Sequence, residues 1–94
     1  MSQGENNPND LGYWIGICEF AIAIAESDAT PQFKYHMIFS KHISQPMFIR
    51  FNLRDLYDYY DPDTTYEEDI EAFIRVVRLL KKDLDSIMER MRNE

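Results

Sequence analysis

The segment from Asp55 to Glu71 carries the densest set of groups that could do chemistry. It holds eight carboxylates and four tyrosines, and no lysine or arginine. Tyrosine offers a large contact area at low conformational cost, and carboxylates attract and select a basic partner. We therefore expect a protein-binding surface in the part of this segment that a helix start does not require, formed by Asp55, Tyr57, Asp58, Tyr59, Tyr60, Asp61 and Asp63.

A calcium loop is the competing interpretation of the same acids. Four side chains fit positions 1, 3, 5 and 9 of an EF-hand loop: Asp61, Asp63, Thr65 and Asp69. Tyr66, however, stands where that loop needs glycine, and Ala72 stands where it needs a bidentate glutamate. We expect neither a metal site nor a cofactor, because one cysteine and two histidines do not complete a structural zinc set either.

Nucleophilic catalysis finds little support in the chain. No glycine-framed serine or cysteine accompanies His36 and His42. Cys18 lies within an apolar run, where it is expected to be a buried small hydrophobic residue, and a single cysteine allows no internal disulfide. We expect a binding protein rather than an enzyme.

Net charge restricts the partner. The formal net charge is −7, with 17 acidic against 10 basic groups, which disfavours non-specific binding to nucleic acid or anionic membranes. We expect a protein partner with a basic surface, such as a nucleic-acid-handling protein. In size and charge the chain resembles stoichiometric inhibitors of the anti-defence, immunity and antitoxin types. The longest apolar run has fifteen residues and contains Glu19, too short to span a bilayer, so a soluble, cytoplasmic protein is expected.

The apolar pattern predicts an α+β fold. Residues 1–10 are expected to be a flexible tail, and 11–94 a single domain. Alternation favours strands over residues 13–25, 33–43 and 47–52, joined as an antiparallel meander. Gly12 and Gly16 would both be costly inside a helix, and the aromatic residues of 13–25 favour a strand there. A helix over 11–26 is an open alternative that gives the order α-β-β-α-α.

Two helices are expected after the sheet. Asn52 could cap a short helix over 53–60. Thr65 and Glu68 have capping-box spacing, which predicts the start of a long helix over about 65–92. Its apolar residues recur at steps of three and four, the heptad pattern of a helix–helix seam: Ile70, Phe73, Val77, Leu80, Leu84, Ile87 and Met91.

The seam raises the question of what covers it. A helix of about 27 residues is about 40 Å long, longer than a compact domain of this size. We expect a homodimer packed on the seam, with a monomer whose other elements cover it as the alternative. In a further hypothesis, assembly through this helix is the whole function.

A small-ligand site is the remaining alternative. Four side chains could share one face of the predicted sheet, where positive groups and an aromatic ring would suit a nucleotide or another anionic signal: Lys34, His36, Phe48 and Arg50. A cleft between two copies of a dimer could serve the same purpose.

Overall fold

The computed structural model describes residues 8–53 and 63–93, and these residues form four helices and no strand. In order they are α1 (Pro8–Glu26), α2 (Pro31–Ile38), α3 (Ser44–Phe51) and α4 (Tyr66–Arg92). The predicted α+β fold, with strands over 13–25, 33–43 and 47–52, is therefore wrong. The open alternative of a helix over 11–26 agrees with α1, although the two strands that followed it do not.

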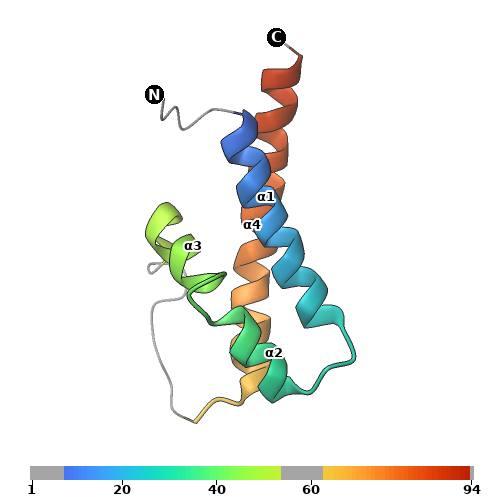
Figure 1. Cartoon of the computed structure of the whole chain (residues 1–94), viewed down its shortest axis with the longest axis vertical. Helices are drawn as coiled ribbons and strands as arrows, with labels where there is room; N and C mark the ends of the chain where they lie inside the picture. The colour runs from blue at the N-terminus through green and yellow to red at the C-terminus, as the bar shows by residue number, and fades with distance from the viewer. Residues whose placement is uncertain (1–7, 54–62, 94) are drawn as a thin grey trace.

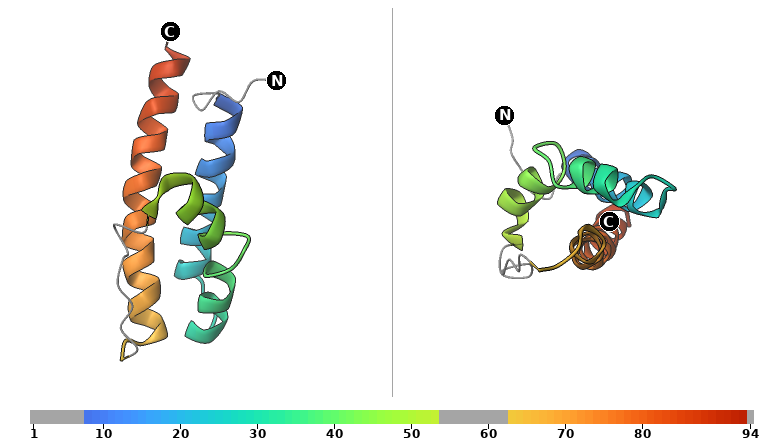
Figure 2. Two further views of the ribbon diagram at one scale, coloured as in Figure 1. Left: turned by 90° about the vertical axis from the view of Figure 1, so that its left-hand side faces the viewer. Right: turned by 90° about the horizontal axis from the view of Figure 1, so that it is seen from below.

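Helices α1 and α4 run antiparallel along the length of the molecule, and the two short helices pack beside them (Figures 1 and 2). The molecule measures 47 × 27 × 22 Å. Its elongated shape accommodates the long helix α4, whose length exceeds the diameter of a compact domain of this size.

Helix α4 begins as the sequence predicts. The Thr65 hydroxyl accepts from the Glu68 backbone N–H at 3.1 Å, and the Glu68 carboxylate accepts from the Thr65 N–H at 3.0 Å. This reciprocal pair satisfies two donors that a helix start leaves without partners. The capping-box prediction is confirmed.

Helix α2 replaces the predicted second strand because its start carries two strong helix signals. Thr30 is the N-cap, with its hydroxyl accepting from the Phe33 N–H at 3.2 Å, and Pro31 occupies the first turn. Proline fits there because its fixed φ suits the helix and the missing N–H has no intrahelical partner to lose.

Helix α3 replaces the predicted third strand. Pro46 falls in its first turn, where proline is tolerated. Residues 44–46, which separate the two predicted strands 33–43 and 47–52, are therefore the start of the helix. Asn52 ends α3 with a left-handed φ of 53°, a conformation that asparagine adopts more readily than most residues. Of the short helix expected over 53–60, residues 54–60 lie outside the described part of the chain.

The core lies where α1, α3 and α4 meet, with α2 closing one end. Trp14 of α1 packs edge-on against Phe51 of α3, with ring centroids 5.1 Å apart, and Phe48 of α3 packs against Phe73 of α4 at 5.6 Å. Ile38, the last residue of α2, is completely buried. Helix α3 thus connects the two long helices through aromatic contacts.

Candidate functional site

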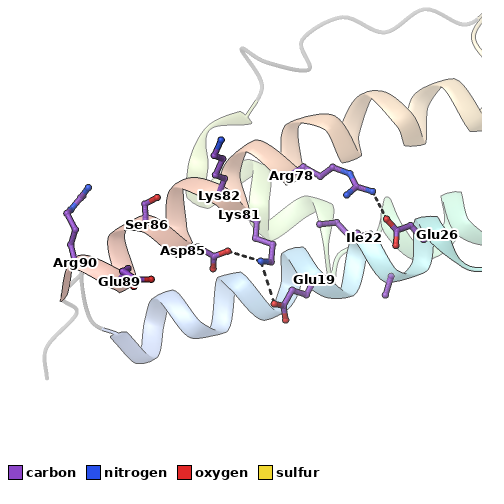
Figure 3. Close-up of a pocket in the computed structure, with 11 residues that line it drawn as sticks. Glu19, Ile22, Glu26, Arg78, Lys81, Lys82, Asp85, Ser86, Glu89 and Arg90 are labelled. Atoms are coloured by element: carbon purple, nitrogen blue, oxygen red, sulfur yellow. Dashed lines mark hydrogen bonds and ion pairs between the residues drawn. The ribbon is translucent and has the colours of Figure 1, made fainter. Parts of the chain in front are cut away.

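Helix α4 borders two hollows on the described surface. The first, the α1–α4 groove, is lined by residues of both helices, most of them charged (Figure 3). The second, the α2–α4 cleft, lies at the other end of α1, where that helix meets α2 and the first half of α4. Both acidic and basic side chains line each of them.

The α1–α4 groove pairs several of its charges within the chain. Lys81 lies 2.7 Å from Asp85 and 3.7 Å from Glu19, and Arg78 lies 2.6 Å from Glu26. The hydrogen bond to Asp85 and the two neighbouring carboxylates raise the pKa of Lys81, so it stays charged. These contacts join α1 to α4 across the groove, while Lys82, Glu89 and Arg90, which also line it, form no ion pair within the described chain.

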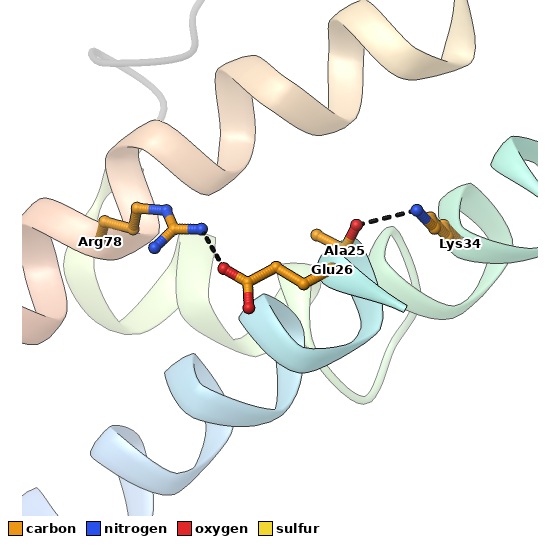
Figure 4. Close-up of polar contacts among 4 residues, drawn as sticks. All are labelled: Ala25, Glu26, Lys34 and Arg78. Atoms are coloured by element: carbon orange, nitrogen blue, oxygen red, sulfur yellow. Dashed lines mark hydrogen bonds and ion pairs between the residues drawn. The ribbon is translucent and has the colours of Figure 1, made fainter. Parts of the chain in front are cut away.

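The α2–α4 cleft has an apolar floor formed by Ile70 and Ile74, both of which are buried. Its volume is about 620 Å³, within the range of about 300–1,000 Å³ that ligand pockets occupy. Lys34 borders it, but its Nζ donates to the Ala25 carbonyl oxygen at 2.8 Å (Figure 4). That bond satisfies one of the last carbonyls of α1, so Lys34 stabilises the end of this helix.

Four acids stand in the first turns of α4, and they divide into two pairs. Glu68 belongs to the capping box, and the Asp69 carboxylate accepts from the Thr64 hydroxyl at 2.9 Å. Glu67 and Glu71 line the cleft instead, one turn apart and exposed. Within the described chain neither forms an ion pair. The cleft therefore combines a buried apolar floor with two exposed carboxylates that form no ion pair, and Arg75 and Arg78 line it as well.

Comparison with protein-family models, with curated proteins and with solved structures finds no match for this chain.

Two tyrosines, Tyr35 of α2 and Tyr66 at the start of α4, pack against each other. Tyr66 is 45% exposed, and its ring lies 4.8 Å from that of Tyr35. Asp63, three residues earlier, is exposed as well. The other residues of the predicted protein-binding surface lie outside the described part of the chain: Asp55, Tyr57, Asp58, Tyr59, Tyr60 and Asp61.

The residues of the small-ligand hypothesis are divided between two helices. Lys34 and His36 lie on α2, and Phe48 and Arg50 lie on α3. Phe48 packs on Phe73, and the Arg50 guanidinium lies 5.1 Å from the centre of the Phe51 ring. The sheet face on which that hypothesis rested does not exist among the described residues, since these segments are helical.

The predicted dimer seam packs within the chain. Ile70, Phe73, Val77 and Leu84 are buried, and the other three seam residues, Leu80, Ile87 and Met91, are partly buried against the same core. Helix α1 supplies much of that cover, with Leu11, Trp14, Cys18 and Ala21 in the same cluster. The dimer itself stays a prediction.

Cys18 is completely buried, and burial raises the pKa of its thiol to about 11. His36 and His42 are exposed on α2 and in the turn that follows it. In the described ranges no three His, Cys, Asp or Glu side chains are placed to hold a metal ion. No described helix is long and apolar enough to cross a membrane.

The sequence analysis did not single out Glu67 and Glu71 as residues of a cleft, because it attributed residues 67–71 mostly to helix initiation. A usable signal was present. Ile70 and Ile74 are four residues apart, as are Glu67 and Glu71, so the two pairs form neighbouring stripes on a helix. A carboxylate stripe beside an apolar stripe indicates a surface that can accept a basic, amphipathic segment.

Proposed function

We propose that this protein is a non-enzymatic binding protein that docks a basic segment of a partner protein in the α2–α4 cleft. Glu67 and Glu71 receive a lysine or arginine side chain, and Ile70 and Ile74 contact its aliphatic part. The observation that carries the proposal is the division of the four acids: the helix start uses Glu68 and Asp69, whereas Glu67 and Glu71 line the cleft and form no ion pair within the described chain.

Physical chemistry favours an arginine or lysine as the docked residue. Long basic side chains place their methylene groups on apolar surface while the charged end stays polar. A guanidinium forms two parallel hydrogen bonds to carboxylates, which adds geometric selectivity. The net charge of −7 would attract a basic partner over a distance set by the salt concentration.

We propose further that the acidic, tyrosine-rich segment 55–63 extends this surface. Two observations at its edge support the extension: Asp63 is exposed, and Tyr66, at the start of α4, is 45% exposed. A surface of this kind suits a stoichiometric inhibitor of the anti-defence, immunity or antitoxin type that occupies the basic site of a nucleic-acid-handling protein.

A matched pair of double variants tests the cleft. A synthetic peptide of alternating arginine and leucine is titrated by calorimetry into the native protein, into Glu67→Gln with Glu71→Gln, and into Asp83→Asn with Glu89→Gln. All four residues are exposed on α4, and both doubles remove two charges. We expect about tenfold weaker binding for the cleft double, since each of the two exposed pairs that it removes contributes up to about 1 kcal/mol, and less than twofold for the control. Equal losses in the two doubles would refute the cleft as the site.

The segment 55–63 is tested separately by replacing Asp58, Asp61 and Asp63 with asparagine. The same peptide should bind this variant more weakly, and the dependence of the affinity on salt should become shallower. Unchanged affinity and unchanged salt dependence would remove the segment from the binding surface while leaving the cleft proposal intact.

A further inference from the structure

Helix α1 has an exposed apolar stripe on the side away from its core face. Its members are spaced by three, four and three residues, as in a heptad, and alternate between large and small: Tyr13, Gly16, Phe20 and Ala23. Tyr13 is 58% and Phe20 is 53% exposed, and the two small residues are exposed as well. Since Leu11, Trp14, Cys18 and Ala21 form the core face, α1 is apolar on two sides, and a helix of that kind is normally covered on both.

No contact within its own chain explains why position 16 of α1 is a glycine. Glycine in a helix interior destabilises the helix relative to alanine. A Cβ placed at Gly16 would find no atom of the chain within 4 Å, whereas one at Gly12 would lie 3.9 Å from Cε of Met88. Packing in the single chain therefore does not require a glycine at position 16. A neighbour that approaches α1 closely would.

We propose that this stripe pairs two copies of the chain, with the two α1 helices antiparallel. Phe20 of each copy lies over Gly16 of the other, and Tyr13 lies over Ala23. Cys18 is midway between the members of both pairs in the sequence, so a single two-fold axis that crosses the stripe at the level of residue 18 satisfies all four contacts. A two-fold dimer requires a self-complementary patch. Here each large residue of one copy packs over a small residue of the same stripe in the other copy.

The charges beside the stripe are compatible with this pairing. Glu19 is next to the centre of the stripe, so the two-fold axis brings the Glu19 residues of both copies towards each other. Lys81 lies 3.7 Å from Glu19 and Arg78 lies 2.6 Å from Glu26, so each carboxylate beside the stripe already has a cation of its own chain. Lys82 and Arg90 add further positive charge to the adjoining α1–α4 groove. Each Glu19 that the pairing brings near its counterpart thus has a cation of its own chain within 4 Å, which it shares with Asp85.

The size of the stripe sets the strength of the dimer. An aromatic side chain buries about 150–250 Å² when fully covered, and Tyr13 and Phe20 each have about half of their surface left to bury. The contact is therefore well below the roughly 800 Å² per partner of a standard interface. We expect a weak dimer whose population rises with protein concentration. The inference does not depend on the α2–α4 cleft.

Sedimentation velocity over a wide range of concentration tests the pairing. The native chain should shift from monomer to dimer as concentration rises, and Gly16→Leu should stay monomeric because its side chain fills the gap that receives Phe20. The space at Gly16 is open in the single chain, and leucine favours a helix, so the melting temperature of the dilute variant should equal or exceed that of the native chain. Ile49→Glu, at an exposed apolar residue of α3, is the control and should dimerise normally. A native chain that remains monomeric, or a Gly16→Leu variant that dimerises like it, would overturn the proposal.

Disulfide cross-linking tests the orientation. Tyr13→Cys and Ala23→Cys are prepared separately, mixed and oxidised with diamide; native Cys18 is buried and should not compete. The antiparallel pairing predicts a disulfide between the two different variants and little cross-linking of either alone. Cross-linking mainly within each separate variant would indicate parallel helices and contradict the inference.

Discussion

Arg78 and Glu26 join α4 to the end of α1 across 52 positions of the sequence, with Nη2 of Arg78 donating to Oε2 of Glu26 at 2.6 Å. The two side chains are 53% and 60% exposed. Solvent therefore screens the pair, and the packing of α1 on α4 must come from the apolar residues beneath it.

The free energy of unfolding should accordingly depend little on this ion pair. We expect Arg78→Gln to lower it by less than about 1 kcal/mol, because exposed pairs contribute little. Leu84→Ala, at a buried site of the same helix, should lower it by about 2–5 kcal/mol. Urea unfolding of the two variants measures both changes, and a larger loss for Arg78→Gln than for Leu84→Ala would contradict the account of the core.

The capping box at the start of α4 should make a measurable contribution to stability. Thr65→Ala removes the hydroxyl that accepts from the Glu68 N–H and should cost about 0.5–2 kcal/mol. Thr65→Ser keeps a hydroxyl and should restore most of that loss. Urea unfolding compares the three proteins, and equal stability of the alanine and serine variants would show that the cap is unimportant.

Cys18 should be unreactive while the protein is folded. Its thiol is completely buried, and burial raises its pKa to about 11, so little thiolate forms at pH 8. Dithionitrobenzoate should react with the chain only in denaturant or at the rate of unfolding. Prompt stoichiometric reaction of the folded protein at pH 8 would contradict the packing of α1.

The same thiol gives a pH dependence with a definite sign. Burial raises the folded-state pKa from 9.0 to about 11, so between these values the unfolded state loses the proton that the folded state keeps. The contribution of Cys18 is therefore complete below pH 9 and lost as the pH rises to about 11. Cys18→Ala should show a smaller decline of stability over that interval, as measured by urea unfolding at several pH values. An identical decline would contradict the prediction.

The sequence predicted α4 well because its signals agree with one another. The capping box at Thr65 and Glu68 fixes the start, and the heptad from Ile70 indicates the face that packs. What covers that face could not be read from the pattern, because a seam is equally consistent with a second copy and with another helix of the same chain. Helix α1 is that cover here.

Helices α1 and α2 were misread as strands because apolar residues on two faces of a helix can imitate alternation. In α2, Phe33 and Met37 are exposed while Tyr35 and Phe39 pack against the core, so i, i+4 pairs on two faces give the same apparent period of two. In α1, packing on α4 outweighs the cost of Gly12 and Gly16. Thr30 followed by Pro31 was the missed helix start.

Mapping of the peptide-binding surface tests the central claim most directly. The backbone amide resonances of the labelled protein are followed by NMR while the arginine–leucine peptide is added. The account predicts that the largest shifts fall on residues 67–75 of α4 and 31–34 of α2, the walls of the α2–α4 cleft, with little change at 85–90, which border the α1–α4 groove. Shifts centred on residues 85–90, or spread evenly over all acidic residues, would contradict it.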